Sequence, residues 1–168
     1  MDQRKTALIV GMAKSGIGAA KLLCRNGYRV IINDQKAQID GLEEALAGYS
    51  VENRLGEEPS SLLTGVDLLV PSPIIPMSTP FIAQAQEAGV EVVSEIELGY
   101  RYARADFVCI TGTNGKTTCT ALTGELFKAG GFHTFVLGNI GVAITEHAEE
   151  TRPGDVIVAE TAALQLAG

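Results

Sequence analysis

Two glycine-containing loops carry the residues of this chain whose types and spacing could do chemistry. The second loop reads Gly112-Thr113-Asn114-Gly115-Lys116-Thr117-Thr118 and joins a β-branched run to a segment of helical period. Backbone N–H groups of such a loop can surround phosphates, the Lys116 ammonium can reach the β and γ phosphates, and the Thr117 hydroxyl can ligate Mg²⁺. A strict Walker A pattern has glycine where Ile110 stands, so that motif is met only in part. The loop predicts a nucleoside triphosphate site but does not identify a reaction.

The first loop, Gly11-Met12-Ala13-Lys14-Ser15-Gly16, follows the apolar run 7–10, and Asp34 ends the next apolar run. This is the layout of a dinucleotide-binding fingerprint, in which the outer glycines make the turn and let helix and strand pack closely. Ala13 replaces the middle glycine, and its methyl group obstructs the approach of an NAD or FAD pyrophosphate. A less deeply held diphosphate could recruit Lys14 and Ser15. The alternative is that the glycines only turn the chain and that Asp34 merely ends a strand.

These loops must be positioned by strands that alternate with helices, the pattern of βαβ units and a parallel sheet. The two strand, loop and helix units begin far apart, at Gly11 and at Gly112. We therefore expect an α/β fold with a Rossmann-like parallel-sheet N-terminal domain over residues 1–93. The start of a P-loop NTPase-type α/β domain follows over 94–168, with the joint at 94–106. The predicted strands are 7–10, 29–33, 67–70, 90–93, 107–111, 134–137 and 156–159, and the predicted helices are 16–26, 79–88, 95–102, 116–129 and 142–147.

Composition narrows the function classes. The chain has 168 residues, and this length excludes a complete large multidomain enzyme. Its residues are 46% hydrophobic, a composition typical of a folded protein. Its formal net charge of −7 argues against unspecific attraction to nucleic acid, so any phosphate binding must be local. The early apolar run 7–10 is too short for a signal or a membrane span, and the cysteines Cys24, Cys109 and Cys119 lack paired spacing. We expect a cytoplasmic chain with reduced thiols and no membrane partner.

The Gly112 to Thr118 loop, taken with the Rossmann-like start and with Gly138-Asn139-Ile140-Gly141, resembles the Mur ligases over the whole chain. These are ATP-dependent amide-forming enzymes of peptidoglycan precursor synthesis, and the order of elements is most similar to the D-glutamate-adding member. The resemblance implies ATP and Mg²⁺ as cofactors and UDP-N-acetylmuramoyl-L-alanine and D-glutamate as substrates. The L-alanine-adding member typically has His at the position of Asn114, and folylpolyglutamate synthetases lack this N-terminal domain.

The resemblance also implies substrate contacts at matching positions. The UDP diphosphate would contact Lys14, Ser15 and Gly16. The uracil would lie by Asp34, Gln35 and Lys36, and the sugar-peptide portion would lie near Ser72 and Pro73.

The implied catalytic set is Lys116, Asn139 and Glu160, with Asn139 facing the substrate phosphates and acyl end. Thr117 would hold Mg²⁺, and Glu160 would hold a second Mg²⁺ directly or through water. From the residues alone, Glu160 follows the predicted strand 156–159, where a carboxylate is a plausible metal ligand in a fold that binds ligands at strand ends. The alternatives are that Glu160 is a solvated strand end and that Asn139 is an ordinary turn residue.

The chain departs from the family pattern in three ways. Ile74 follows Pro73 where the family usually has glycine. After the glutamate the family commonly reads Ser-Ser-Phe-Gln-Leu-Glu, whereas in this chain Thr161 is followed by Ala162-Ala163-Leu164-Gln165-Leu166 and the sequence stops with Ala167-Gly168. The family's later metal-site residues, adenine pocket and C-terminal domain are missing. We therefore expect an N-terminal piece that binds ligands but barely turns over. Apolar residues near the end, among them Val156, Ile157, Val158, Leu164 and Leu166, should form an exposed patch that favours self-association.

The parent reaction implied is attack of a substrate carboxylate on the γ-phosphate of ATP, followed by capture of the acyl phosphate by an amine. Another Mur ligase, such as the L-alanine-adding enzyme, is one alternative. A non-catalytic nucleotide or UDP-sugar binding module is another. A P-loop GTPase-like switch is disfavoured, because guanine-selecting motifs are not recognisable. His133 and His147 have no carboxylate at ligand spacing in the sequence, so both are expected at the surface without a role.

Overall fold

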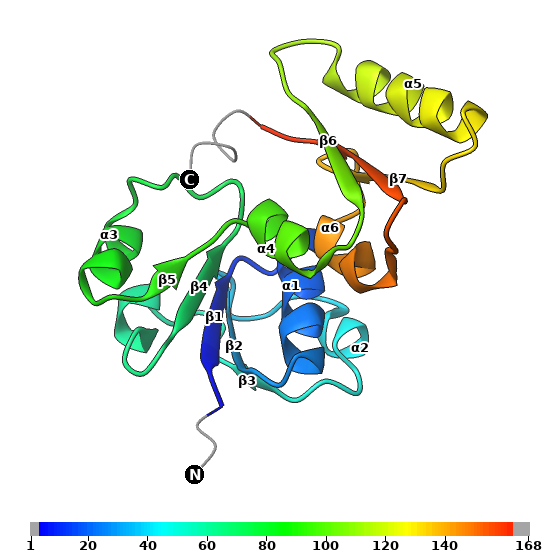
Figure 1. The fold of residues 1–168 in the computed structure, drawn as a ribbon. Helices are drawn as coiled ribbons and strands as arrows, with labels where there is room; N and C mark the ends of the chain where they lie inside the picture. The colour runs from blue at the N-terminus through cyan, green and yellow to red at the C-terminus, as the bar shows by residue number, and fades with distance from the viewer. Residues whose placement is uncertain (1–3, 163–168) are drawn as a thin grey trace. The chain divides into compact units, whose positions relative to one another are not determined.

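The chain folds into two α/β units, which confirms the predicted fold class (Figure 1). The computed structural model describes residues 4–162, and the two compact units are Met1–Glu95 and Ile96–Gly168. Within residues 4–162, no helix combines the length and apolar character needed to cross a membrane.

The first unit is built on a five-stranded parallel sheet. Its strands are β1 (Thr6–Val10), β2 (Arg29–Asn33), β3 (Val51–Asn53), β4 (Leu68–Pro71) and β5 (Glu91–Val92), in the order β3-β2-β1-β4-β5. The chain thus moves outward from β1 to β3 and then returns to build the other half from β4. In open α/β sheets, ligands bind outside the carboxyl ends of the strands at such a reversal. The place to look for a site is therefore between the loops that follow β1 and β4.

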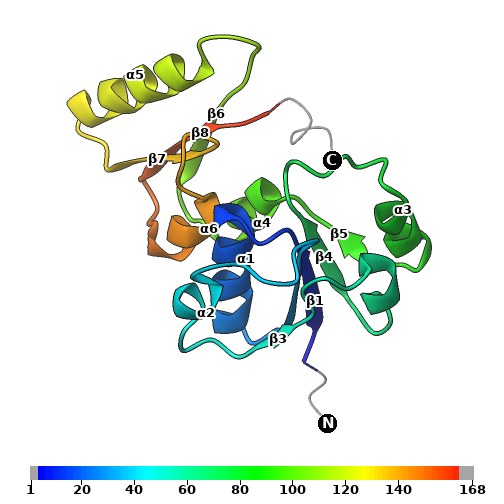
Figure 2. The same ribbon diagram turned by 180° about the vertical axis from the view of Figure 1, so that it is seen from behind.

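Helices cover both faces of this sheet, and its central strands β1 and β4 are therefore buried along their whole length without alternation. The helices are α1 (Lys14–Arg25), α2 (Leu42–Ala45) and α3 (Pro80–Glu87), with a 3₁₀ turn η1 (Pro59–Leu62). Figures 1 and 2 show α1 and α3 on opposite sides of the sheet. Leu8 and Leu69 pack with Phe81 and Ile82 of α3 in one core. The buried side of α1 contributes Leu22 and Leu23.

The second unit has a three-stranded parallel sheet in the order β6-β8-β7, formed by β6 (Asp106–Ile110), β7 (Thr134–Gly138) and β8 (Val156–Glu160). One face packs against α4 (Glu95–Tyr102) and α6 (Ile144–His147), where Ile96 and Ile144 contact Ile157. The other face carries α5 (Lys116–Ala129), whose Gly124 lies against Val136. A second 3₁₀ turn, η2 (Ala148–Glu150), precedes β8. This arrangement puts the β6 and β7 loops on either side of the end of β8.

The prediction of an exposed apolar edge at residues 156–158 is wrong. Val156 is 4% exposed and Ile157 and Val158 are fully buried, because β8 lies between two neighbouring strands and under helices on both faces. The large exposed apolar side chains of α5 are instead Leu122 and Leu126, at 60% and 64%. They lie one helical turn apart, on the side of α5 that does not face the sheet. Leu164 and Leu166 lie outside the described residues, and self-association stays a prediction.

Two glycines make the loop after β1 possible. A β-carbon at Gly16, in the first turn of α1, would overlap the carbonyl oxygen of Gly11. Gly11 itself has φ +97°, and a β-carbon there would lie 2.5 Å from the Cβ of Ser72 at the end of β4. The start of α1 and the ends of β1 and β4 therefore approach as closely as backbone atoms allow.

We predict that Gly16→Ala destabilises the first unit by about 3 kcal/mol, because the added methyl meets backbone that cannot rotate away. Ser15→Ala, one residue earlier in the same turn, is the matched control and should cost less than about 1 kcal/mol. Amide hydrogen exchange of β1 measures the stability of the first unit in both variants. Equal protection of β1 in Gly16→Ala and Ser15→Ala would contradict the close packing.

Candidate ligand sites at the carboxyl ends of the two sheets

A cavity of about 650 Å³ opens at the carboxyl end of the first sheet, where the strand order reverses. Asp34 and Gln35 line it from the end of β2, and Ser72 lines it from the end of β4. These are three of the residues expected at a UDP-sugar site. Gly11 of the first loop also lines the cavity, so the loop and the two neighbouring strand ends share one space.

Asp34 connects the strand end to the first glycine loop. Its carboxylate accepts a hydrogen bond from the Met12 N–H at 2.8 Å and another from the Lys36 N–H at 3.1 Å. Each carboxylate oxygen can accept more than one hydrogen bond, so Asp34 keeps acceptor capacity for a ligand. The side chain therefore does more than end a strand, because it also ties the loop after β1 to the loop after β2.

The side of the cavity opposite β4 is formed by residues 56–59, which the sequence did not indicate as part of a ligand site. Asn33 is 1% exposed, and its amide donates to the carbonyl oxygens of Arg54 at 2.7 Å and Glu57 at 2.9 Å. This holds Glu57 and Glu58 on the cavity. The sequence does show Asn33 as a polar residue at the end of an apolar strand, and a buried amide there needs hydrogen-bond partners. Its partners lie more than 20 residues away and could not be identified from the sequence.

The other residues expected on the UDP-sugar lie outside the cavity lining: Lys14, Ser15, Gly16, Lys36 and Pro73. Lys14 and Ser15 belong to the first turn of α1, which has no side-chain cap and no acidic residue. That turn is suited to an anion, since helix N-termini present N–H groups and a positive dipole end. Gly16 is buried against Gly11, which gives it a packing role.

The second glycine loop runs from the end of β6 into the uncapped start of α5. Gly115 is the N-cap with φ +73°, a conformation that strains residues bearing a β-carbon. The Lys116 ammonium folds back and donates to the Gly112 carbonyl oxygen at 2.7 Å. The chain from Thr113 to Gly115 is exposed. The loop thus presents backbone and one ammonium to solvent, as a phosphate site requires.

Strand register brings the other two expected catalytic residues to this loop. Ile110, Glu160 and Gly138 are paired across the three strands, so Glu160 lies between the start of the glycine loop and Asn139. The Asn139 N–H donates to the Glu160 carbonyl oxygen at 2.9 Å. Gly138 has φ +93°, and a β-carbon there would overlap the same carbonyl. Because side chains alternate along a strand, Glu160 shares the sheet face that α5 covers.

Glu160 has the character of a metal ligand. It is 5% exposed, and its Oε2 atom is buried without a hydrogen-bond partner. An unpaired buried carboxylate oxygen is costly, and a cation would compensate it. Among the described residues, no group of three or more His, Cys, Asp or Glu forms a metal cluster. Mg²⁺ does not require one, because it usually takes one or two protein oxygens and completes its shell with water and phosphate. Glu160 and the Thr117 hydroxyl fit that donor set.

The histidines have partners that the sequence did not reveal. His133 Nδ1 lies 3.2 Å from an oxygen of Asp155, and His147 Nδ1 lies 2.9 Å from one of Glu150. The expectation that neither histidine has a carboxylate partner is therefore wrong. The Arg152 N–H, helped by His133, holds the pKa of Asp155 below its usual value. The His133–Asp155 pair lies at the opposite strand ends from the glycine loop, because these residues precede β7 and β8 and Glu160 ends β8.

Comparison with known proteins identifies the family of the chain. Residues 5–94 match the family described as "Mur ligase MurD-like, N-terminal domain". The UDP-N-acetylmuramoylalanine--D-glutamate ligase of Alkaliphilus metalliredigens is 44% identical over 168 residues, which cover 98% of this chain and 37% of that protein. The enzyme of the same name from Exiguobacterium sibiricum is 43% identical over 166 residues, 99% of this chain and 37% of that protein. The chain thus spans little more than a third of the relatives it matches.

Solved structures show the same fold at low identity. A UDP-N-acetylmuramate-alanine ligase from Thermotoga maritima matches with a TM-score of 0.54 and 18% identity over 94% of this chain and 37% of that one. A UDP-N-acetylmuramate:L-alanyl-gamma-D-glutamyl-meso-diaminopimelate ligase from Neisseria meningitides matches with a TM-score of 0.57 and 15% identity over 95% of this chain and 55% of that one. With more than half of its residues matched by the family description, the chain belongs to the MurD-like Mur ligases.

Proposed function

We propose that this chain is the N-terminal part of an ATP-dependent amide ligase that adds D-glutamate to UDP-N-acetylmuramoyl-L-alanine in the cytoplasm. The observation that carries the proposal is the 44% identity to a D-glutamate ligase over 98% of the chain, which includes both candidate sites. Residues 1–93 are the UDP-substrate domain in this proposal, and 94–168 begin the ATP-binding central domain. The exposed apolar side chains on α5 make self-association of the isolated chain an expected property.

The charges of the first site favour different positions for the uridine and for the diphosphate of the UDP-sugar. Among the residues that the structure describes, the cavity is lined by Asp34, Glu57 and Glu58 and by no lysine or arginine. A diphosphate there would be repelled, whereas the N–H and hydroxyl groups of a uridine could donate to their carboxylate oxygens. The diphosphate is better placed at the first turn of α1, beside Lys14 and Ser15. Gln35 and Lys36 flank the uracil in this arrangement, and Ser72 and Pro73 the sugar.

The second site would bind the ATP phosphates on the Gly112 to Thr118 loop. Lys116 would exchange the Gly112 carbonyl for phosphate oxygens and neutralise charge that develops on the γ-phosphate. Asn139, next to Glu160, would orient the acyl end of the substrate. A Mg²⁺ ion held by Thr117 and a second one held by Glu160 would supply further charge neutralisation. Transfer of a phosphoryl group to a carboxylate is mainly a matter of positioning and electrostatics, which suits a loop with no general base.

A non-catalytic UDP-sugar or nucleotide binding module is the main alternative for the isolated chain. It would need the first cavity and the glycine loop but would have no use for a buried carboxylate oxygen without a hydrogen-bond partner, as at Glu160 Oε2. Glu160 therefore favours the ligase. The L-alanine-adding Mur ligase remains the alternative within the family, and Asn114 in place of the expected His argues against it.

The function is tested by joining this chain to the remaining part of the Alkaliphilus metalliredigens relative, in place of that protein's own matching residues. We predict phosphate release that requires ATP, UDP-N-acetylmuramoyl-L-alanine and D-glutamate together. The hybrid with Lys116→Ala is the negative control. A folded hybrid that binds UDP-N-acetylmuramoyl-L-alanine but releases no phosphate would favour the binding module.

Lys116→Ala should weaken ATP binding to the chain by at least about tenfold and change AMP binding by less than about twofold, because only ATP has the phosphates that the ammonium would reach. Lys128→Ala is the matched control, since Lys128 lies on the same helix and pairs with Glu125. Calorimetry with both nucleotides measures the difference. Equal losses for ATP and AMP would remove Lys116 from the proposed site.

Glu160→Met should stabilise the second unit by about 1 to 2 kcal/mol in metal-free buffer, because it replaces an unpaired buried carboxylate by an apolar side chain of similar size. The same change should abolish stabilisation by Mg²⁺ in the presence of ATP. Glu146→Met, at an exposed position of α6, is the control. Hydrogen exchange of β8 reports both effects, and a loss of protection in metal-free Glu160→Met would show that the carboxylate is already compensated.

A further inference from the structure

The cavity of the first unit has two chemically different walls. One is polar and comes from the ends of β2 and β3, with Asp34, Gln35, Glu57 and Glu58. The other is apolar and comes from the segment that joins β4 to α3, with Ile74, Ile75, Pro76 and Phe81. A ligand that fills this space needs hydrogen-bond donors on one edge and an apolar face on another side.

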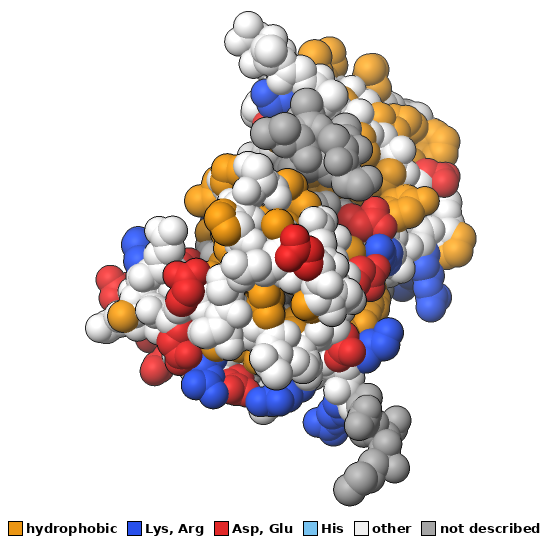
Figure 3. Space-filling model, turned by 90° about the vertical axis from the view of Figure 1, so that its left-hand side faces the viewer, with side chains coloured by type: hydrophobic (Ala, Val, Ile, Leu, Met, Phe, Trp, Pro, Cys, Tyr) orange, Lys and Arg blue, Asp and Glu red, His pale blue; other side chains and the backbone are white. Residues whose placement is uncertain are grey.

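Ile74 stands out on the apolar wall because it lines the cavity and yet is 88% exposed. Phe81 is buried and Ile75 is half-buried, so these two already belong to the core behind the wall. On the face of the molecule seen in Figure 3, hydrophobic side chains are exposed among acidic ones. A single exposed isoleucine is ordinary, but one at the mouth of a cavity offers apolar area that a ligand could cover.

The segment that carries Ile74 is held in place before any ligand arrives. The Ile75 N–H donates to the Ser72 carbonyl at 2.9 Å, and the Thr79 hydroxyl donates to the Pro76 carbonyl at 2.6 Å. Pro73 and Pro76 restrict the backbone further. No described residue other than glycine has a positive φ, so Ile74 fits this turn without strain. A contact on such a segment costs little conformational entropy.

We infer that Ile74 is a substrate-contacting residue that packs on the face of the pyrimidine ring of a bound uridine nucleotide. The inference rests on the proposed function, which supplies the uridine. A uracil ring has the two properties that the walls require, since its edge carries an N–H donor for the Asp34 side and its face is apolar. The diphosphate and sugar lack a flat apolar face, so the base is the part that Ile74 covers.

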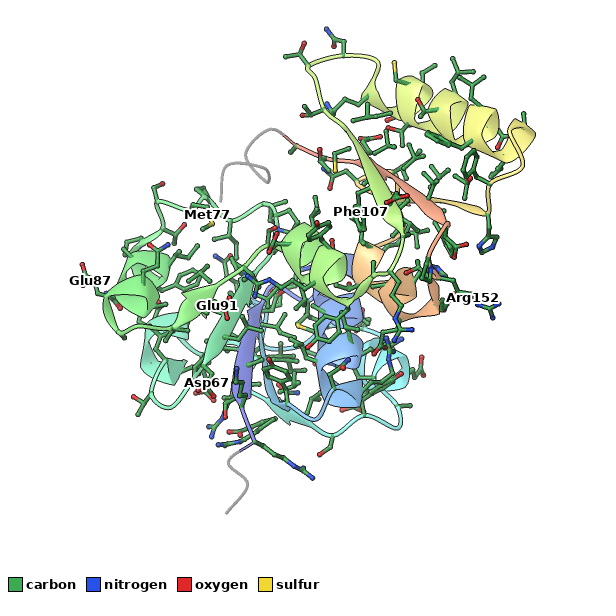
Figure 4. The ribbon with its side chains drawn as sticks, in the orientation of Figure 1. Asp67, Met77, Glu87, Glu91, Phe107 and Arg152 are labelled. Atoms are coloured by element: carbon green, nitrogen blue, oxygen red, sulfur yellow. The ribbon has the colours of Figure 1, made fainter. Side chains whose placement is uncertain are left out.

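The test is calorimetric titration of the chain with UDP and with inorganic pyrophosphate, which lacks the base. Ile74→Ala should weaken UDP binding by about five- to tenfold through lost apolar contact and leave pyrophosphate binding unchanged. Ile74→Leu should retain UDP affinity within about twofold. Met77→Ala is the matched control, because Met77 lies on the same β4 to α3 segment and is 48% exposed but does not line the cavity (Figure 4).

A direct contact is expected as well, as NMR cross-relaxation between the Ile74 methyl groups and the H5 and H6 protons of bound UDP. UDP binding that is unchanged in Ile74→Ala, or cross-relaxation only to ribose protons, would overturn the role of Ile74 and leave the UDP site standing. Equal weakening of UDP and pyrophosphate would also overturn it, because the effect would then be on the phosphates. No UDP binding by the unaltered chain would overturn both this inference and the proposed substrate.

Discussion

Both candidate sites depend on one constraint, which is that backbone segments at the carboxyl ends of the sheets meet without any β-carbon between them. Gly16 lies against the Gly11 carbonyl, and Gly138 lies against the Glu160 carbonyl. The first contact brings the start of α1 onto the loop after β1. The second brings the Asn139 turn onto the end of β8. In the first unit this contact places the helix start proposed to meet the diphosphate, and in the second it places Asn139 beside Glu160; a single methyl group would separate the segments in either case.

Both glycine loops lead into a helix N-terminus suited to an anion, but the backbone conformations at the two N-caps differ. Both helices begin without a side-chain cap and without an acidic residue in the first turn, which leaves each N-terminus suited to an anion. The second loop has Gly115 in a left-handed conformation at the N-cap, whereas the first has Ala13 in an extended one. An extended alanine keeps its methyl group on the approach to the helix. The proposed diphosphate site of the first unit would therefore be shallower than the proposed triphosphate site of the second.

The parts of the fold that the sequence predicted are those with local signals. The bounds of β2, α4 and α5 were predicted as the structure has them, since apolar runs and helical periodicity need no distant partner. The strand β3 and the helix α2 were missed. They are three and four residues long, too short for periodicity to indicate. The strand β3 is fixed by pairing with β2, and the segment after it is held by the Asn33 amide.

The candidate sites likewise contain residues that the sequence predicted and residues that it did not. The glycine loops and Glu160 were recognisable from sequence, whereas the acidic wall of Glu57 and Glu58 was not, because it exists only once Asn33 has bound that segment. The burial of β8 was misjudged for a related reason. A sequence lists strands in chain order, and nothing local says that the last described strand inserts between the two before it. The histidine pairs with Asp155 and Glu150 likewise depend on turns that bring the side chains together.

The negative charge of the whole chain explains why phosphate recognition has to be so local. At −7 the molecule repels anions at long range, and the proposed phosphate sites offset this with backbone N–H groups, helix ends and single lysines, which act over a few ångströms. Glu160 adds a further negative charge directly beside the loop that would hold a triphosphate. A buried carboxylate and a polyphosphate repel each other, and a cation held by Glu160 would offset that repulsion. Nucleotide binding at the proposed second site would then depend on the metal ion, and Glu160 would be the residue that causes this dependence.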